Sequence, residues 1–217
     1  YEHYTRWRDP NLAYGEALAR VAGRATLRLA NAPLLPFEFV AFADNVTLYI
    51  QELEDLIEKM RKETRVQNAQ LDEGIFELAL DPTKSLKAPK RQAEVPHLNF
   101  APLKNSLAQL QITAEKYNQT IGNGTLSAKD QTSVNQMLYM TERKLTRPHG
   151  LTGRSWYKHH IYAPGFYTGY GVKTIPGVRE AIEIREFDEA GKQVTIAAEV
   201  LDSLTRQIKA ILTLTAT

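Results

Sequence analysis

The sequence predicts an all-α fold: an up-and-down four-helix bundle with extra short helices and one long ordered loop rich in aromatic residues and glycine. Apolar residues recur at alternating spacings of three and four along several segments, the pattern of helices that bury one face. No glycine-bounded segment shows the alternation of a half-buried strand. Mostly short turns join the segments, which favours a bundle whose apolar stripes pack against one another. The stripes are Tyr14, Leu18, Val21, Ala25 and Leu29; Val46, Ile50, Leu53, Ile57 and Met60; Leu103, Leu107, Leu110, Ala114, Tyr117 and Ile121; Val134, Leu138, Thr141 and Leu145; and Ala197, Leu201, Leu204, Ile208 and Ile211.

The first two helices are bounded by proline. Asp9-Pro10 is typical of an N-cap followed by proline at the first helical position. Pro33 and Pro36 are expected to end the first helix, because proline lacks a backbone donor and disfavours helical geometry in the preceding residue. The second helix is expected to start near Phe37. Its charged outer face is interpreted as solvated and carries Glu52, Glu54, Asp55, Glu58, Lys59 and Arg61.

The third and fourth helices have clear boundary signals. Gly122 and Gly124 are expected to end the third helix, because glycine adopts the left-handed conformation of a C-cap at little cost. Ser127 then caps the fourth helix, with Asp130 three residues later as a weaker capping-box partner. Pro148 closes this helix.

A proline-punctuated segment separates the second and third helices. Residues 66–99 lose the helical period and carry several basic residues, so they are interpreted as an irregular surface excursion with a short helix at residues 73–80. So long a connection inside a compact domain is unusual and often functional or mobile. A family-specific surface insertion is the simpler explanation.

The last third of the chain opens with the aromatic loop. Residues 151–177 hold six aromatic residues among glycines and show no helical period, so they form the ordered, partly buried loop. A helix is expected over residues 177–186, an interruption at 188–191, and a last helix over 192–212. No clear boundary divides residues 1–217, so they are predicted to form a single domain.

Composition narrows the possible functions. The 217 residues carry a formal net charge of +2 with both signs interspersed, whereas a nucleic-acid binder usually shows a one-signed patch. No run of about 18 apolar residues predicts a membrane segment. The absence of cysteine excludes disulfides, thiolate metal sites and a thiol nucleophile. The chain starts with Tyr1 rather than methionine, which is expected of a piece of a longer protein.

Reactive motifs are missing from the sequence. The five histidines form no HExxH motif, and the adjacent His159 and His160 would point in different directions. Ser155 lies near His159 in the sequence, but no nucleophile elbow and no orienting acid accompany it. We therefore expect no catalytic and no metal-binding residue in this chain. The aromatic loop suits a recognition surface and a packed structural loop equally well.

Several short motifs follow one another in a fixed order along nearly the whole chain. They are Tyr1-Glu2, Asp9-Pro10, Leu29-Ala30-Asn31, Leu34-Leu35-Pro36-Phe37, Leu145, Pro148, Gly150 and Leu151, the run WYKHHIYAP at residues 156–164, Tyr170, and Ile175-Pro176-Gly177. In this order and spacing they resemble the transferrin receptor-like dimerisation domain of glutamate carboxypeptidase II-like proteins. The match is weakest over residues 66–99.

The resemblance implies a longer parent protein. That protein would carry a catalytic domain with two zinc ions, interrupted by a protease-associated domain, and then this helical domain. All zinc ligands and the catalytic carboxylate would lie upstream, with the last zinc-binding histidine a few residues before Tyr1. This chain would hold no cofactor. Its partners would be a second copy of itself, the peptidase domain and, only in the full-length protein, a peptide substrate.

The resemblance also gives the aromatic loop a role in the substrate pocket. Glutamate-preferring members present a Lys-Tyr pair to the terminal glutamate of the substrate, and the matching positions here are Gly169 and Tyr170. Tyr170 can keep its contact, but the lysine is missing, and Lys173 is off the matching position. A charge-assisted hydrogen bond contributes roughly 1.5–3 kcal/mol, so we expect a weakened preference for glutamate.

The sequence therefore predicts the homodimerisation domain of a zinc-dependent exopeptidase that also lends a loop to the substrate pocket. One alternative is the same domain from a catalytically inactive, receptor-like homologue, and another is a self-sufficient hydrolase. The sequence leaves the compartment unknown, although the resemblance suits a secreted, periplasmic or membrane-anchored extracellular protein.

Overall fold

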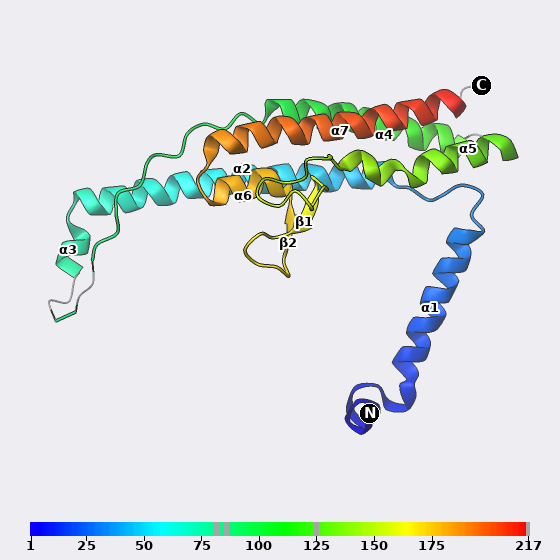
Figure 1. Ribbon diagram of the computed structural model, residues 1–217, viewed down its shortest axis with the longest axis horizontal. Coiled ribbons are helices and arrows are strands. Elements are labelled where there is room, and N and C mark those ends of the chain that lie inside the picture. Colours follow the sequence, from blue (N-terminus) through cyan, green and yellow to red (C-terminus); the bar gives the residue numbers. More distant parts are fainter. Residues whose placement is uncertain (80–82, 85–86, 124–125, 216–217) are drawn as a thin grey trace.

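The computed structural model describes residues 1–79, 83–84, 87–123 and 126–215, and it confirms the all-α fold. Four long helices form the bundle (Figure 1): α2 (Phe39–Asp72), α4 (Ala101–Asn123), α5 (Ala128–Tyr139) and α7 (Phe187–Thr215). In Figure 1, α2 and α5 run one way along the bundle and α4 and α7 run the other way. The elements outside these four helices are a π-helical turn (Tyr4–Arg8), 3-10 helices (Pro10–Leu12 and Thr141–Leu145), α1 (Ala13–Ala30), α3 (Ile75–Ala79), β1 (Tyr162–Pro164), β2 (Val172–Thr174) and α6 (Pro176–Glu183).

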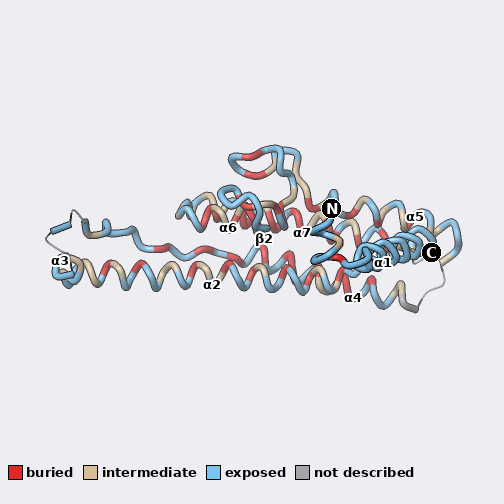
Figure 2. Tube along the Cα trace, turned by 90° about the horizontal axis from the view of Figure 1, so that it is seen from below, coloured by how far each residue is buried: buried red, intermediate tan, exposed pale blue. Residues whose placement is uncertain are grey.

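The core of the bundle consists of the apolar stripes that the sequence predicts for its long helices. Leu103 and Leu110 of α4 are fully buried, as are Leu201 and Ile208 of α7. Helix α4 packs mainly against α7 and also against α2. Figure 2 shows the buried positions recurring along these helices, at the spacing expected when one face of each helix turns inward.

Helix α1 departs from the predicted bundle. It forms a helix with the expected apolar stripe, but none of its residues is buried. Leu18 is 69% exposed and Val21 is 66% exposed. The helix projects away from the four bundle helices (Figure 1), and its apolar face is exposed. The prediction that this stripe packs in the bundle was therefore wrong.

The start of α1 also differs from the prediction. Pro10 opens a 3-10 turn rather than α1 itself, and Asn11 and Leu12 adopt left-handed backbone conformations between the two. The carboxylate of Asp9 nevertheless accepts hydrogen bonds from the backbone N–H groups of Tyr14 (2.7 Å) and Gly15 (2.8 Å). Asp9 thus satisfies donors of the first turn of α1 from across the kink.

The segment after α2 is more regular than the sequence predicts. Helix α2 continues to Asp72, so residues 66–72 are helical rather than irregular. Helix α3 occupies the centre of the predicted short helix. Residue 80, the predicted end of that short helix, and Gly124, a predicted end of α4, lie outside the described residues. Residues 87–99, here called the strap, run back along α2 (Figure 1). Asn68 fixes the strap by donating to the Gln92 carbonyl (2.9 Å) and accepting from the Gln92 N–H (3.1 Å). Val95 and Leu98 of the strap are buried.

The outer face of α2 is not simply solvated. Glu52 accepts hydrogen bonds from Arg179 of α6 (2.5 Å) and from the Thr174 hydroxyl of β2 (3.3 Å). Glu54 pairs with Lys104 of α4 at 2.6 Å. The interpretation of this face as solvated was therefore incomplete, because two of its carboxylates join α2 to neighbouring elements.

Helix α5 is shorter than predicted, and helix α7 is longer. Ser127 caps α5 as expected, because its Oγ accepts a hydrogen bond from the Asp130 N–H at 3.2 Å. Helix α5 then ends at Tyr139, earlier than predicted, and a 3-10 helix follows. Helix α7 already begins at Phe187, so the predicted interruption at residues 188–191 was wrong. Asp188 and Glu189 lie in its first turn, where a negative charge interacts favourably with the positive end of the helix dipole.

Candidate functional site

The aromatic loop folds as a small hairpin on the side of the bundle. Strands β1 and β2 pair in antiparallel register, with Ala163 opposite Lys173. Residues 165–171 connect the two strands and are here called the hairpin loop. The Gly165 N–H donates to the Gly171 carbonyl (2.8 Å), and the Gly169 N–H donates to the Gly165 carbonyl (3.1 Å). A Cβ at Gly165 would lie 2.3 Å from Thr168 Oγ1, so any larger residue there would require the Thr168 side chain to move.

The two residues predicted from the resemblance lie together in the hairpin loop. Gly169 has a φ of +66°, and a Cβ placed there would have open space around it. Tyr170 follows with its side chain fully exposed, while its N–H donates to the Thr168 carbonyl at 2.7 Å. Lys173 does not replace the missing lysine, because its ammonium pairs with Glu183 of α6 at 2.6 Å. The hairpin loop thus presents a tyrosine on an ordered backbone.

A buried ion pair lies beneath the hairpin loop. Arg154 Nη2 lies 2.7 Å and 2.8 Å from the two carboxylate oxygens of Glu180 on α6. Only 3% of the Arg154 side chain and 14% of the Glu180 side chain are exposed. The guanidinium also lies over the rings of Tyr157 and Phe166, at 5.2 Å and 5.7 Å from their centroids. Charges this deeply buried need a partner, and each residue supplies one to the other.

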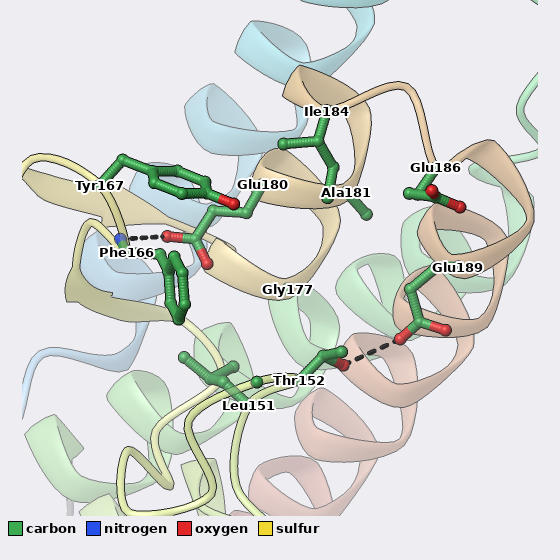
Figure 3. A pocket seen from close by; sticks show the side chains of 11 residues that line it. Leu151, Thr152, Phe166, Tyr167, Gly177, Glu180, Ala181, Ile184, Glu186 and Glu189 are labelled. Carbon is green, nitrogen blue, oxygen red and sulfur yellow. Dashed lines mark hydrogen bonds between the residues drawn. The ribbon is translucent and has the colours of Figure 1, made fainter.

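A cleft of about 390 Å³ opens between the hairpin loop, α6 and the start of α7 (Figure 3). Glu189 stands at one side, where hydrogen bonds from Gln193 and then Thr152 hold the pKa of its carboxyl below the ordinary value. Most of the remaining surface is apolar, which suits a packed side chain more than a reacting group. The lining residues are Leu151, Thr152, Gly153, Phe166, Tyr167, Gly177, Glu180, Ala181, Ile184, Glu186 and Glu189.

A second polar cluster lies at the other end of the hairpin. The Tyr162 hydroxyl donates to Glu142, and this hydrogen bond raises the pKa of Tyr162 to about 12. His159 Nε2 lies 3.1 Å from the same carboxylate, while His159 Nδ1 accepts from the N–H groups of Ile161 and Tyr162. Burial lowers the pKa of His159, although Glu142 partly offsets this effect. Because Nδ1 accepts two backbone N–H groups, the ring carries a proton on Nε2, the nitrogen that faces Glu142.

The neighbouring His160 has a different environment. It is 4% exposed, and burial, with smaller contributions from Arg147 and His159, lowers its pKa from 6.5 to about 4. His159 instead stacks on Tyr162 with ring centroids 4.1 Å apart. The two adjacent histidines thus contribute to packing and to a hydrogen-bond cluster.

The family described as the transferrin receptor-like dimerisation domain matches residues 98–209, more than half of the chain. The chain belongs to this family. The match runs from the end of the strap through α4, α5, the hairpin and α6 into the last turns of α7. The dimerisation domain thus includes the bundle contact between α4 and α7 and the whole hairpin loop.

Curated relatives extend the similarity beyond the matched range. A probable glutamate carboxypeptidase from Arabidopsis thaliana is 31% identical over 186 residues, which covers 84% of this chain and 22% of that protein. Another from Zea mays is 24% identical over 191 residues, covering 88% of this chain and 22% of the relative. A third, from Arthroderma benhamiae, is 22% identical over 210 residues, covering 94% and 25%. The chain thus spans about a quarter or less of the length of these relatives.

Among the described residues, no group of three or more His, Cys, Asp or Glu side chains is placed to hold a metal ion. None of the helices in the described ranges combines the length and the hydropathy that a membrane span needs.

The sequence did not reveal Arg154 and Glu180 as site residues. They are 26 positions apart, and neither belongs to a motif that the sequence singles out. Glu180 lies on the short α6, which begins at Pro176. The one signal available was weak: Arg154 is a cation in a partly buried segment, but so are Lys158 and Lys173.

Proposed function

We propose that this chain is the homodimerisation domain of a zinc-dependent exopeptidase. The observation that carries the proposal is the family match over α4, α5, α6 and α7, the helices that build the bundle. The curated relatives are named probable glutamate carboxypeptidases, and they are four to five times as long as the matched part. The symmetric homodimer is the commonest oligomer and needs only one self-complementary patch.

In this proposal the zinc ions belong to the peptidase domain of the full-length protein. The described residues of this chain do not fit a zinc site, because they offer no cluster of three suitable side chains. Two zinc ions and the catalytic residues would therefore lie outside the dimerisation domain. The domain would act by association and by positioning.

Association is tested by the mass of the full-length protein. Sedimentation equilibrium should give twice the mass of one chain, and this mass should persist on dilution into the low micromolar range. A single-chain mass at high protein concentration would exclude homodimerisation. A stable dimer without peptidase activity towards any peptide would favour the receptor-like alternative.

We further propose that the hairpin loop enters the substrate pocket of the peptidase domain. The support is the combination of an ordered backbone with a fully exposed Tyr170. An exposed tyrosine offers an apolar ring and a hydroxyl to a partner at a low cost in conformational entropy. The peptide substrate would meet this loop only in the full-length protein.

Restoring the missing ammonium tests the pocket directly. Gly169→Lys in the full-length protein should raise kcat/KM for peptides ending in glutamate over those ending in glutamine by about 10-fold or more, since a charge-assisted hydrogen bond contributes roughly 1.5–3 kcal/mol. The position has open space for a side chain. Its φ of +66° strains any non-glycine residue, so Gly169→Met is the matched control with the same backbone strain and no charge.

Two results would remove the hairpin loop from the pocket. One is an equal change in Gly169→Lys and Gly169→Met, which would reflect backbone strain alone. The other is a Tyr170→Phe protein with unchanged KM and kcat/KM, since the loss of a hydroxyl that contacts substrate should raise KM. The self-sufficient hydrolase is tested separately: turnover by this chain alone with added zinc, or stoichiometric tight zinc binding in calorimetry, would establish it.

A further inference from the structure

The hairpin loop is fastened where it leaves β1. The Pro164 carbonyl, at the end of β1, accepts a hydrogen bond from Arg154 Nη1. The Phe166 N–H donates to Glu180 Oε1 at 2.8 Å, as Figure 3 shows. These two backbone groups flank Gly165, the first residue of the hairpin loop. One ion pair therefore holds the backbone on both sides of the point where the loop begins.

The far part of the hairpin loop has little support of its own. The Tyr170 side chain is fully exposed, and a Cβ at Gly169 would have no neighbour within 4 Å. Backbone hydrogen bonds at Gly165, Gly169 and Tyr170 close the turn, but they lie within the loop itself. The direction in which the loop points therefore depends on its root, where Arg154 and Glu180 lie.

We propose that Arg154 and Glu180 are positioning residues that hold the hairpin loop, and with it Tyr170, in the orientation that meets the substrate. This inference rests on the proposed role of the loop in the pocket. Neither residue touches the substrate in this arrangement. A loop ordered before binding avoids the entropy cost of ordering on binding, and even a small misplacement of a contact group weakens its effect.

The test must separate loop position from global stability. A single substitution at Arg154 or Glu180 leaves the other charge buried without a partner, which destabilises the whole fold. The double variant Arg154→Met/Glu180→Leu removes both charges, and replacement of a buried ion pair by apolar residues of similar size is often neutral for stability. It also removes the partners of the Pro164 carbonyl and the Phe166 N–H.

The full-length protein is used, with two readouts. Hydrogen–deuterium exchange of the amides of residues 165–171 should become at least about 10-fold faster in the double variant, since exchange follows local opening. KM for peptides with a C-terminal glutamate should rise about 10-fold while kcat changes little, because a displaced contact weakens binding before chemistry. The control is Lys104→Met/Glu54→Leu, which removes a more exposed ion pair between α4 and α2 and should change neither readout.

Arg154→Lys covers the case in which the double variant does not fold. Lysine keeps the buried charge pair but lacks the planar fork that reaches the carboxylate and the Pro164 carbonyl together. Exchange of the hairpin loop and KM should both rise by a few-fold.

Each combination of results decides the matter. Unchanged exchange of residues 165–171 in every variant that folds overturns the positioning role, whatever the kinetics. Faster exchange with unchanged KM also overturns it, provided that Tyr170→Phe still raises KM, and the loop then keeps its proposed place in the pocket. If Tyr170→Phe has no effect either, the proposed function of the loop fails and the inference fails with it.

Discussion

Helices α1 and α4 carry similar apolar stripes, but the stripe is exposed in α1 and buried in α4. Both place apolar side chains three or four residues apart along one face. In α4 the stripe is buried, with Leu110 fully inaccessible, whereas in α1 Leu18 is 69% exposed. The period of a sequence thus identifies a helix and the face that it will bury, but not the surface that covers this face.

The largest expected difference is the cost of truncating matched leucines. Leu110→Ala should lower the free energy of unfolding of this chain by about 2–5 kcal/mol, because it removes buried contacts and leaves a cavity. Leu18→Ala should change it by less than about 0.5 kcal/mol, as is usual for an exposed site. Urea unfolding of the two variants measures both values. A cost above about 1 kcal/mol for Leu18→Ala would show that α1 is packed in solution.

Acid should weaken the bundle and spare α1, because only the packed region contains a buried histidine. The folded pKa of His160 is about 4, below the ordinary 6.5, so between these values the unfolded chain binds a proton that the folded chain does not. Stability therefore falls as the pH is lowered from 6.5 towards 4, by up to the order of 3 kcal/mol.

Urea unfolding at pH 7 and pH 5 measures this dependence. His160→Gln should make the pH dependence shallower, while His149→Gln, at an exposed site, is the control. An equally steep fall in the His160→Gln protein would assign the acid sensitivity to other groups.

The smallest expected effects come from the two helix caps. Ser127→Ala and Asp9→Ala each remove a side-chain acceptor at a helix start, a change that typically costs about 1 kcal/mol. For α5 this loss should appear in the global urea midpoint, because α5 packs against α7. For α1 it should appear only as faster hydrogen exchange of the Tyr14 and Gly15 amides. A shift of the global midpoint in Asp9→Ala would contradict the independence of α1.

The periodicity of apolar residues predicted the bundle well where a helix is long and amphipathic. Leu103, Leu107 and Leu110 were assigned to the buried face of α4 from spacing alone, and all are buried. It failed where tertiary packing outweighs local preference. Residues 188–191 look like a break, yet Ala190 is fully buried within α7. Strands β1 and β2 are three residues each, too short for any alternation to be recognised.

The candidate site was predicted only in part. Gly169 and Tyr170 came from the resemblance of the surrounding motifs, and no spacing rule would have selected them. The pair of Arg154 and Glu180 could not be predicted, because a single sequence carries no signal that joins a cation to a carboxylate 26 positions away. Contacts between residues far apart in the sequence depend on how the helices and turns pack, and local sequence patterns do not specify that packing.

Two hydrogen bonds join Asn68 to Gln92, and this pair is here called the amide bracket. The bracket makes the end of the molecule around α3 tolerant of insertions. Both backbone groups of Gln92 are fixed to one side chain, so an insertion within the strap would shift Val95 and Leu98 out of their buried positions. An insertion on the α3 side of the bracket only lengthens a closed loop, and doubling such a loop costs roughly 0.6 kcal/mol.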